Sequence, residues 1–333
     1  MMEHLPARHS KTEITQILDK LWPEPRSRYA AASVAENTRR AYRSDMDHFL
    51  SWGGGLPSTT QEVIDYLEDH ATTLSIRTLR RRVATLNEAH RLYGFESPAD
   101  SGHIRRVLRG IARTEGKPPR KAPPLMLDQA CMLIRRLDGT PAGVRDRAMI
   151  LVGWSLFLRR SELVAYDYSH LKIMRDRATL MIDQSKTDQE RLGKILALPR
   201  IGGPACPVTA LETWLNISGI TSGPIFRRVF RGGAIGKESD RLTAASVNLI
   251  LKKRATEAGV DDALLFSGHS LRRGGITQAY ASQQSEADIQ RVSRHRSLMQ
   301  LRDYRDESAA LAGEQPATDF LKALNDKLVE PSA

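Results

Sequence analysis

Cysteine is scarce in this sequence, and so are long apolar runs. Only two of its 333 residues are cysteines, Cys131 and Cys206, and their wide separation excludes a disulfide framework or a zinc site built from cysteines. The apolar stretch 148–158 is interrupted by Gly153 and Ser155, and it falls short of the roughly 20 residues that span a bilayer. The sequence therefore predicts a protein with neither membrane helices nor disulfides.

The start of the chain also lacks the features of a secretion signal. Glu3, His4 and Arg8 stand where a signal peptide carries its apolar segment. Together with the scarcity of cysteine, this favours a protein of the reducing cytoplasm.

Positive charge, by contrast, is in excess. Lysine and arginine number 50 against 39 acidic residues, and the formal net charge of +11 predicts attraction to polyanions such as nucleic acids. Many arginines fall in rows on successive expected helices, as they would on a surface that follows phosphates. We expect DNA contacts from Arg39, Arg40 and Arg43 on one helix, Arg77, Arg80 and Arg81 on the next, and Arg105 and Arg106 on a third.

The first part of the chain has a helical period. An N-terminal extension, 1–32, holds one short helix at 12–21, and apolar residues then recur every three or four positions through 33–115. Ser58 is the expected N-cap of the second helix in that range. We predict a helical core DNA-binding domain of four or five helices at 33–115.

A basic, proline-rich segment follows at 116–124. Its four prolines forbid a helix and favour an extended connector between two domains. Because it also carries Lys117, Arg120 and Lys121, we expect it to lie along DNA.

The remainder, 125–333, combines helices with a small β-rich insert. Strands are expected at 178–183 and 194–198, on either side of a polar hairpin tip. Helices are expected at 127–137, 142–158, 208–214, 243–258, 272–281, 286–291 and 298–304. The predicted fold class is mostly α with a small antiparallel β-sheet, in which a helical N-terminal domain precedes a C-terminal α+β domain.

Two short motifs in the second domain could act on a phosphate. Arg159 and Glu162 lie at the expected C-terminal end of an apolar helix, where a buried arginine needs a partner. His269, in an expected loop, and Arg272, at the expected start of a helix, are three positions apart, so both side chains could reach one phosphate. Each motif by itself is a weak signal.

The combined order of six residues is far more specific. Arg159, Lys186, His269, Arg272, His295 and Tyr304 follow one another in the second domain, with 23 residues from Arg272 to His295 and nine from His295 to Tyr304. This resembles the tyrosine recombinase (phage integrase) family, in which Arg-x-x-Glu-Leu, a hairpin Lys, His-x-x-Arg, a His or Trp and a nucleophilic Tyr occur in this sequence. The resemblance runs from about residue 33 to the end of the chain.

Two positions depart from the family pattern. Where the family usually has Leu-Gly-His, this chain has Ser293-Arg294-His295, so His295 is assigned by its spacing. Lys194, on the strand after the hairpin, is an alternative to Lys186 as the hairpin lysine.

The resemblance implies a site-specific DNA recombinase of the compact Cre or Xer type, which cleaves and rejoins strands through a 3′-phosphotyrosine. Tyr304 would attack phosphorus, and Lys186 would protonate the departing 5′-oxygen. The arginine pair, with Glu162 in support, and the histidine pair would stabilise the charge that develops on the phosphorane. Because the arginines take the place of a metal, neither a metal nor another cofactor is expected.

The same resemblance implies partners and an origin. The substrate would be double-stranded DNA with short inverted-repeat core sites, bound by a monomer in solution that forms a homotetramer in the synapse, and no membrane would be involved. Apolar residues at 317–330 predict a short helix, which could fold back onto its own domain. The resemblance implies instead that it docks on a neighbouring protomer. We expect a prokaryotic, phage, plasmid or transposon protein associated with the nucleoid.

Other functions remain alternatives at this point. A type IB topoisomerase or a telomere-resolving enzyme would use similar residues, although both tend to carry further domains. A non-catalytic DNA-binding regulator would need none of the six residues. A metal-dependent transposase or nuclease would need clustered carboxylates, and no such cluster stands out in the sequence.

Overall fold

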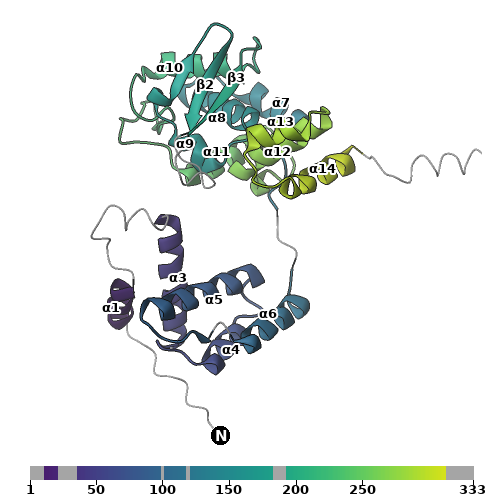
Figure 1. Ribbon diagram of the computed structural model, residues 1–333. Coiled ribbons are helices and arrows are strands. Elements are labelled where there is room, and N and C mark those ends of the chain that lie inside the picture. Colours follow the sequence, from purple (N-terminus) through teal and green to yellow (C-terminus); the bar gives the residue numbers. More distant parts are fainter. Residues whose placement is uncertain (1–10, 22–35, 99–100, 118–120, 183–192, 313–333) are drawn as a thin grey trace, which may run out of the picture. The chain divides into compact units, whose positions relative to one another are not determined.

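The chain is seen here in a computed structural model that describes residues 11–21, 36–98, 101–117, 121–182 and 193–312 (Figure 1). Its contacts divide it into two compact units, residues 1–120 and 121–333, which are treated separately below. The fold is mostly helical with one small antiparallel sheet, which confirms the predicted fold class.

The first unit consists of helices around one apolar core. They are α1 (Lys11–Leu21), α3 (Glu36–Trp52), α4 (Thr60–Asp69), α5 (Ile76–Leu92) and α6 (Gly102–Thr114). The core is built from residues spaced three or four apart on each helix, among them Met46, Phe49 and Leu50 on α3. Arg77, Arg80 and Arg81 of α5 lie outside this core and are exposed.

One expected helix start in this unit was wrong. The N-cap of α4 is Thr59, whose hydroxyl accepts a hydrogen bond from the Glu62 amide while its own amide donates one to the Glu62 carboxylate. Ser58 is buried instead, and its amide donates to Nε2 of His90 on α5. The reciprocal hydrogen bonds between Thr59 and Glu62 make Thr59 the cap in place of Ser58.

The second unit alternates helices with the sheet. Its elements are α7 (Leu127–Arg136), α8 (Pro141–Ser155), α9 (Arg160–Ala165), η2 (Tyr168–His170), β1 (Leu171–Ile173), β2 (Arg177–Ile182), β3 (Lys194–Pro199), α10 (Pro207–Ser218), α11 (Ala244–Glu257), η3 (Ala263–Leu265), α12 (Gly268–Ala281), α13 (Glu286–Ser293) and α14 (Met299–Leu311). Helix α8 is buried along most of its length and packs against α10 and α12. None of the described helices is both long and apolar enough to cross a membrane.

The sheet has the order β1-β2-β3, with both pairs antiparallel. Ala178, Leu180 and Ile182 of β2 point into the core in the alternation expected of a half-buried strand. The register pairs Ile182 with Lys194, so Lys194 begins β3 opposite the end of β2. Strand β1 was not predicted, because three residues are too few to show an alternating pattern.

The helix expected at 142–158 ends earlier. Leu156 caps α8 at its C-terminus, and Phe157 then adopts a positive φ of 50°, which no α-helix can contain. The apolar run continues to Leu158 because these residues are still buried, so hydrophobicity gave no sign of the break. Arg159 consequently lies at the N-cap of α9 and not at the end of α8.

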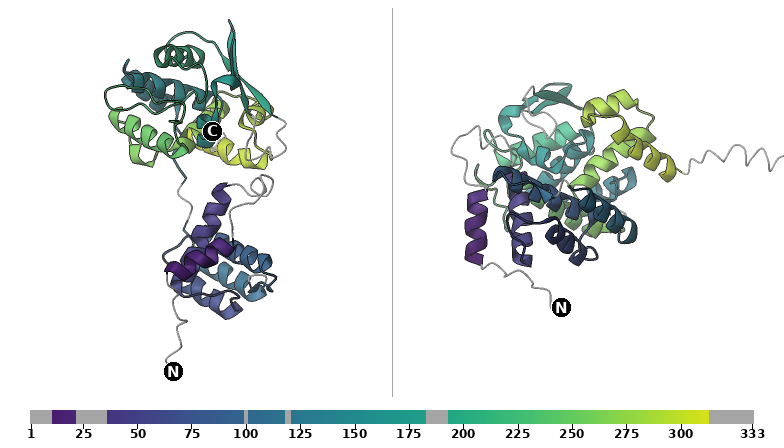
Figure 2. Two further views of the ribbon diagram at one scale, coloured as in Figure 1. Left: turned by 90° about the vertical axis from the view of Figure 1, so that its left-hand side faces the viewer. Right: turned by 60° about the horizontal axis from the view of Figure 1, so that its bottom comes forward.

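Helices α12, α13 and α14 lie together in the views of Figures 1 and 2. A small apolar cluster, consisting of Ile276, Ile289 and Leu301 with partly buried neighbours that include Phe157 and Tyr304, joins them. It is separate from the main core of the unit. Helix α14 continues past the predicted end at residue 304 to Leu311, through a polar stretch that carries no apolar stripe.

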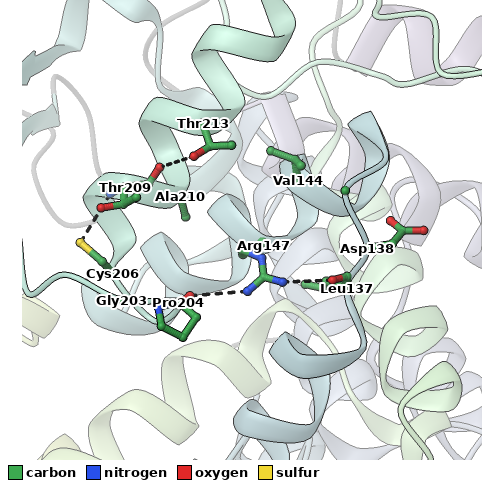
Figure 3. A pocket seen from close by; sticks show the side chains of 11 residues that line it. Leu137, Asp138, Val144, Arg147, Gly203, Pro204, Cys206, Thr209, Ala210 and Thr213 are labelled. Atoms are coloured by element: carbon green, nitrogen blue, oxygen red, sulfur yellow. Dashed lines mark hydrogen bonds between the residues drawn. The ribbon is translucent and has the colours of Figure 1, made fainter.

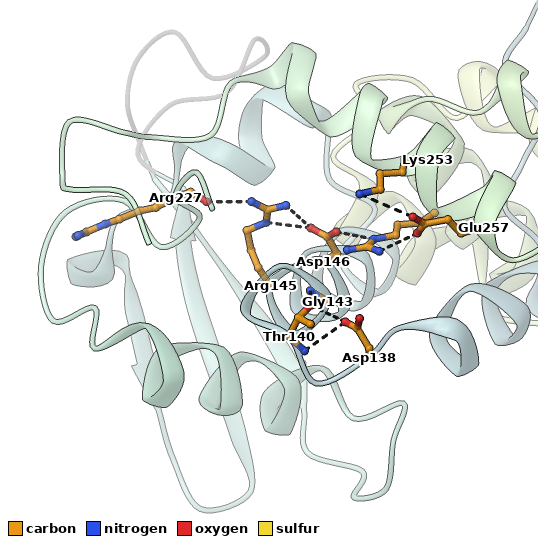
Figure 4. A network of polar contacts seen from close by, with 9 residues as sticks. Asp138, Thr140, Gly143, Arg145, Asp146, Arg227, Lys253 and Glu257 are labelled. Carbon is orange, nitrogen blue, oxygen red and sulfur yellow. Dashed lines mark hydrogen bonds and ion pairs between the residues drawn. The ribbon is translucent and has the colours of Figure 1, made fainter. Parts of the chain in front are cut away.

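A buried ion-pair network fixes α8 to α11 (Figure 4). Arg145 donates two hydrogen bonds to one carboxylate oxygen of Asp146, at 2.9 and 2.6 Å, and Arg254 donates to the other at 2.7 Å. The Asp146 side chain is only 3% exposed. This carboxylate therefore balances two guanidinium groups that have little access to water.

We expect Asp146→Asn to lower the free energy of unfolding by about 3–5 kcal/mol, because it leaves buried cations without their counter-charge. Urea denaturation followed by circular dichroism measures this loss. The matched control is Glu257→Gln, since Glu257 contacts Arg254 at 2.8 Å but its side chain is 39% exposed. That change should cost less than about 1 kcal/mol. Equal losses in the two variants would show that burial of the Asp146 network is not what stabilises this unit.

Candidate active site

Among the expected site residues that the structure describes, Arg272 is the most deeply buried. It lies on the first turns of α12 and is 2% exposed. Its guanidinium donates to the carbonyl of Phe157 at 2.6 Å and to the carbonyl of Ser293 at 2.7 Å, and it contacts Nε2 of His295 at 3.0 Å. One side chain thus holds the turn after α8 and the end of α13 in place.

Two glycines after Arg272 allow α12 to approach its neighbours closely. A Cβ atom on Gly274 would overlap the backbone of Leu125, and one on Gly275 would overlap the carbonyl of Trp154 and the ring of Phe157. The Leu125 amide also donates to the Ser270 carbonyl at 3.0 Å. The sequence Arg-Arg-Gly-Gly therefore places Arg272 within reach of the Phe157 carbonyl.

His295 is held in one neutral form. Arginine can only donate, so the Nε2 atom that faces Arg272 must accept, and Nδ1 carries the proton that it donates to the Ser293 hydroxyl at 2.8 Å. Burial lowers the pKa of His295 most, and the charges of Arg272 and other arginines lower it further, to about 3. His295 is therefore uncharged at neutral pH.

Arg159 and Glu162 form a compact pair at the start of α9. Nη1 of Arg159 donates to Oε1 of Glu162 at 2.7 Å, and the Arg159 amide donates to Oε2 at 2.8 Å. Oε2 also accepts from Arg294 at 2.6 Å. Burial acts to raise the pKa of Glu162, but Arg294 and Arg159 outweigh it, and the net pKa lies below its ordinary value.

His269 and Tyr304 approach the same region from α12 and α14. His269 is in the first turn of α12 and not in the loop before it, as was expected, because Ser267 caps the helix and accepts from the His269 amide. Tyr304 is partly buried, and its ring centroid lies 5.8 Å from that of His295. The ion pair between Arg273 and Glu307 helps to hold α14 against α12.

The electrostatic effects of these residues on one another indicate that they are neighbours. Partial desolvation lowers the pKa of His269 most, followed by the charges of Arg272, Arg273 and Arg159. Burial lowers the pKa of Arg272, Arg159 lowers it further, and Tyr304 acts to raise it. Arginine nevertheless stays protonated in proteins, so the site presents fixed positive charge beside a neutral His295.

The lysine assignment rests partly on residues that are not described. Lys186 lies outside the described residues. Lys194 is exposed at the start of β3 and lines a recess of about 400 Å³ with His295, Arg294, Arg291 and Arg296. Partial burial lowers the pKa of Lys194, and Arg294 and Arg291 lower it further. A lysine in this recess is easier to deprotonate than a free one.

Arg294 was not predicted as a site residue. The signal available in the sequence was the departure at 293–295, where the family usually has Leu-Gly-His. The structure brings the Arg294 side chain to Glu162, 132 positions earlier in the chain, which no local pattern could have indicated.

The arginines expected to bind DNA differ in their surroundings. Four of them contact acidic side chains of the same unit: Arg39 and Arg40 contact Glu36, Arg43 contacts Asp19, and Arg81 makes a two-bond contact with the buried Asp45. Arg80, Arg105 and Arg106 are exposed and line a recess of about 610 Å³ with Arg109, while Arg77 and Lys117 are also exposed. In the second unit Lys121 contacts Asp303 at 3.2 Å, and Arg120 lies outside the described residues.

The second unit has a further recess, which is shown in Figure 3. It measures about 320 Å³ and lies between α8 and α10, beside Cys206 and Arg147. Arg147 donates to the carbonyls of Ile134 and Leu137, which ties α7 to α8. None of the five described residues among the expected catalytic six lines it. No group of three or more His, Cys, Asp or Glu side chains that could hold a metal occurs within the described part of the chain.

Comparison with known proteins gives a consistent result. The model of the phage integrase family matches residues 125–310. An integrase/recombinase xerD homolog of Selenomonas ruminantium is 33% identical over 282 residues, which are 82% of this chain and 82% of that protein. The recombinase cre of Escherichia phage P1 is 26% identical over 237 residues, which are 66% of this chain and 67% of that protein.

Solved structures share the fold. The XerH site-specific recombinase bound to palindromic difH substrate, in a post-cleavage complex, superposes with a TM-score of 0.64 over 93% of this chain and 84% of that one, at 13% identity. A lambda integrase tetramer bound to a Holliday junction gives a TM-score of 0.57 over 89% of this chain and 77% of that one, at 19% identity.

The buried Glu162 predicts a pH-dependent contribution to stability. Its folded-state pKa is below the ordinary 4.5, so the unfolded chain binds the proton more readily and stability falls as the pH drops. Glu162→Gln should lower the free energy of unfolding by about 3 kcal/mol at pH 7. The difference between the variant and the wild type should shrink as the pH falls below about 4.5. Urea denaturation from pH 7 to pH 3 measures both quantities.

The control is Glu212→Gln, which removes the partner of Arg200 in a pair whose side chains are 27% and 31% exposed. This variant should lower the free energy of unfolding by less than about 1 kcal/mol at pH 7. A Glu162→Gln deficit that stays constant down to pH 3 would contradict a charged, buried Glu162.

Proposed function

The chain belongs to the phage integrase family of tyrosine recombinases, and from this premise we propose that Tyr304 is the nucleophile with which it cuts DNA. The protein is a site-specific recombinase, an enzyme that breaks DNA strands and rejoins them. The alternatives, a type IB topoisomerase, a telomere-resolving enzyme and a non-catalytic regulator, are not favoured by these similarities.

The observation that carries the assignment of residues is the position of Arg272. Its buried guanidinium contacts His295 directly, and the Tyr304 ring lies near His295, with 5.8 Å between the two ring centroids. A guanidinium held by two backbone carbonyls needs no rearrangement when negative charge develops next to it.

The reaction would proceed by two transesterifications. The Tyr304 oxygen attacks phosphorus and forms an O–P bond, the bond from phosphorus to the 5′-oxygen breaks, and the result is a 3′-phosphotyrosine with a free 5′-hydroxyl. Attack by a 5′-hydroxyl on this linkage reverses the step and releases the tyrosine. Because the number of phosphodiester-type bonds is conserved, rejoining needs no ATP.

The two arginines would act on the charge of the phosphorane. Arg159 and Arg272 donate to its non-bridging oxygens, and Glu162 keeps Arg159 oriented. His269 donates to the same oxygens or helps to remove the tyrosine proton, and His295, whose Nδ1 proton is engaged by Ser293, orients Arg272 through its Nε2 atom. The charge stabilisation is thus assigned to protein side chains, and the proposed mechanism uses no metal or other cofactor.

DNA is the partner, and the basic surface of the first unit is the part that we propose to follow its backbone. The exposed group around Arg80, Arg105 and Arg106 supports this better than Arg81, whose guanidinium is already engaged by Asp45. We propose the domain limits 33–115 for core DNA binding, 116–124 for a basic linker and 125–333 for catalysis, after an extension at 1–32.

We further propose a tetramer in the synapse, formed from monomers on short inverted-repeat core sites. The lambda integrase with a similar fold is a tetramer on a Holliday junction, and the XerH relative is bound to a palindromic site, which supports this assembly. The docking helix expected at 317–330 lies outside the described residues. A DNA substrate also supports a cytoplasmic location at the nucleoid.

The proposed nucleophile is tested by Tyr304→Phe. The change removes one hydroxyl and keeps the ring that packs beside Ile276, Ile289 and Leu301, so binding to a core site should persist. Cleavage of a nicked site and the covalent protein–DNA complex should disappear, as denaturing gel electrophoresis would show. A covalent complex that still forms with Tyr304→Phe would disprove the assignment.

Arg106→Ala is the matched control for that experiment, because Arg106 is an exposed residue of the first unit. It should weaken binding and reduce the slope of log K against log salt by about 1, while saturating DNA is still cleaved.

The general acid is tested by substitution of sulfur for the 5′-bridging oxygen. Loss of a general acid typically costs about 10²–10⁴-fold, and a thiolate leaves without a proton. Lys186→Ala should lose cleavage of the ordinary strand by this amount and recover on the sulfur substrate, whereas Lys194→Ala should show no such recovery. The reverse pattern would transfer the role to Lys194, which lines the recess next to His295.

A further inference from the structure

Arg294 occupies a backbone conformation that arginine seldom adopts. It is the C-cap of α13, with φ 59° and ψ 39°, in the left-handed region where glycine is the usual residue. A side chain with a Cβ atom is strained there, and a glycine would make the same turn without strain. The turn alone therefore does not require an arginine.

The side chain of Arg294 is nevertheless directed inward. It is only 6% exposed, and it donates to Oε2 of Glu162 at 2.6 Å and to the Val292 carbonyl at 2.7 Å. Its Nε atom is buried without a hydrogen-bond partner. A buried, incompletely satisfied guanidinium adds a second local cost to the strained backbone.

Glu162 connects Arg294 to the site. The same carboxylate accepts from the side chain and the amide of Arg159, so it joins α9 to the turn at 293–295. His295 is the next residue after Arg294, and its ring faces Arg272. The ion pair between Glu162 and Arg294 thus helps to fix the positions of Arg159 and His295 relative to each other.

We propose that Arg294 is a positioning residue of the recombinase, which acts through Glu162 to hold Arg159 and through the backbone to hold His295 for the strand-cleavage step. This inference rests on the proposed catalytic roles of those two residues. Strain and incomplete hydrogen bonding at a position that glycine could fill are typical of a residue retained for function at a site.

The electrostatic surroundings agree with this role. Burial lowers the pKa of His295 most, followed by the charges of Arg272 and Arg159, and the positive charge of Arg294 lowers it further. It also lowers the pKa of Lys194, after partial burial. Arg294 therefore helps to keep His295 neutral.

The test compares substitutions at position 294 in the full chain on a nicked core site. Arg294→Gly removes the ion pair and relieves the backbone strain, so a purely structural turn residue would give a protein at least as stable and as active as the wild type. We expect the rate of covalent complex formation at saturating DNA to fall about a hundredfold, with core-site affinity unchanged, because small displacements of catalytic groups have effects of this size.

Two further variants separate charge from fold. Arg294→Lys and Arg294→Gln both keep a side chain in the left-handed turn, so their difference reports the positive charge beside Glu162. The Lys variant should cleave at least about tenfold faster than the Gln variant, a difference equivalent to about 1.4 kcal/mol. This comparison applies even if Arg294→Gly does not fold.

The matched control for strain is Gln283→Gly. Gln283 is exposed after α12 and has a positive φ of 55°, and its amide donates to the Tyr280 carbonyl at 2.8 Å. Its replacement should relieve the same kind of strain and leave cleavage unchanged.

Glu162→Gln and Arg294→Gly should also be non-additive, since each breaks the same pair. Wild-type cleavage rates in Arg294→Gly, or equal rates in the Lys and Gln variants, would overturn the role of Arg294. Absence of a covalent complex with the wild-type protein would instead reject the proposed function itself, so the two failures are distinguishable.

Discussion

The burial of the Arg272 guanidinium is the constraint on which the rest of the site depends. A charge withdrawn from water costs several kcal/mol unless hydrogen bonds replace its hydration. The chain supplies these from the turn after α8 and from the end of α13, which lie far apart in sequence. Those two turns must therefore come together around α12 if the domain is to fold at all. Arg159 and His295, both proposed for catalysis, lie on these turns, so one electrostatic requirement both stabilises the domain and brings these two residues to the site.

Much of this arrangement was predictable from sequence, because it is encoded locally. The helical periods, the hairpin and the linear order from Arg159 to Tyr304 are properties of neighbouring residues or of fixed spacing, and the fold class and family follow from them. The break at Phe157 was not predictable, since a buried helix and a buried turn are equally apolar. The pairing of Arg294 with Glu162 depends on two residues 132 positions apart, and their contact exists only after the start of α9 and the turn that follows α13 have come together.

The pattern of basic residues in the sequence likewise could not show which arginines pair with acidic residues of the same unit. Rows of arginine on α3, α5 and α6 look alike in sequence, yet the structure separates them by their partners. Asp45 is 2% exposed and engages Arg81, so part of that row stabilises the helical unit internally. The group around Arg105 and Arg106 lines an open recess instead. A count of basic residues therefore overstates the charge available to a polyanion, because it does not subtract the ion pairs that form between helices.

The small size of the apolar cluster that joins α12, α13 and α14 affects how readily α14 opens. Segments held by few buried contacts open at a lower free energy than those inside a large core, and hydrogen exchange detects the difference. Helix α8 is surrounded by the main core, whereas the buried apolar residue of α14 is Leu301, which packs in the small cluster with Ile276 and Ile289. The amide protons of α14 should therefore exchange sooner than those of α8. The helix that carries Tyr304 can then be displaced by local opening while the turns around Arg272 stay folded, so the protein separates the mobility of the nucleophile from the rigidity of the charged site.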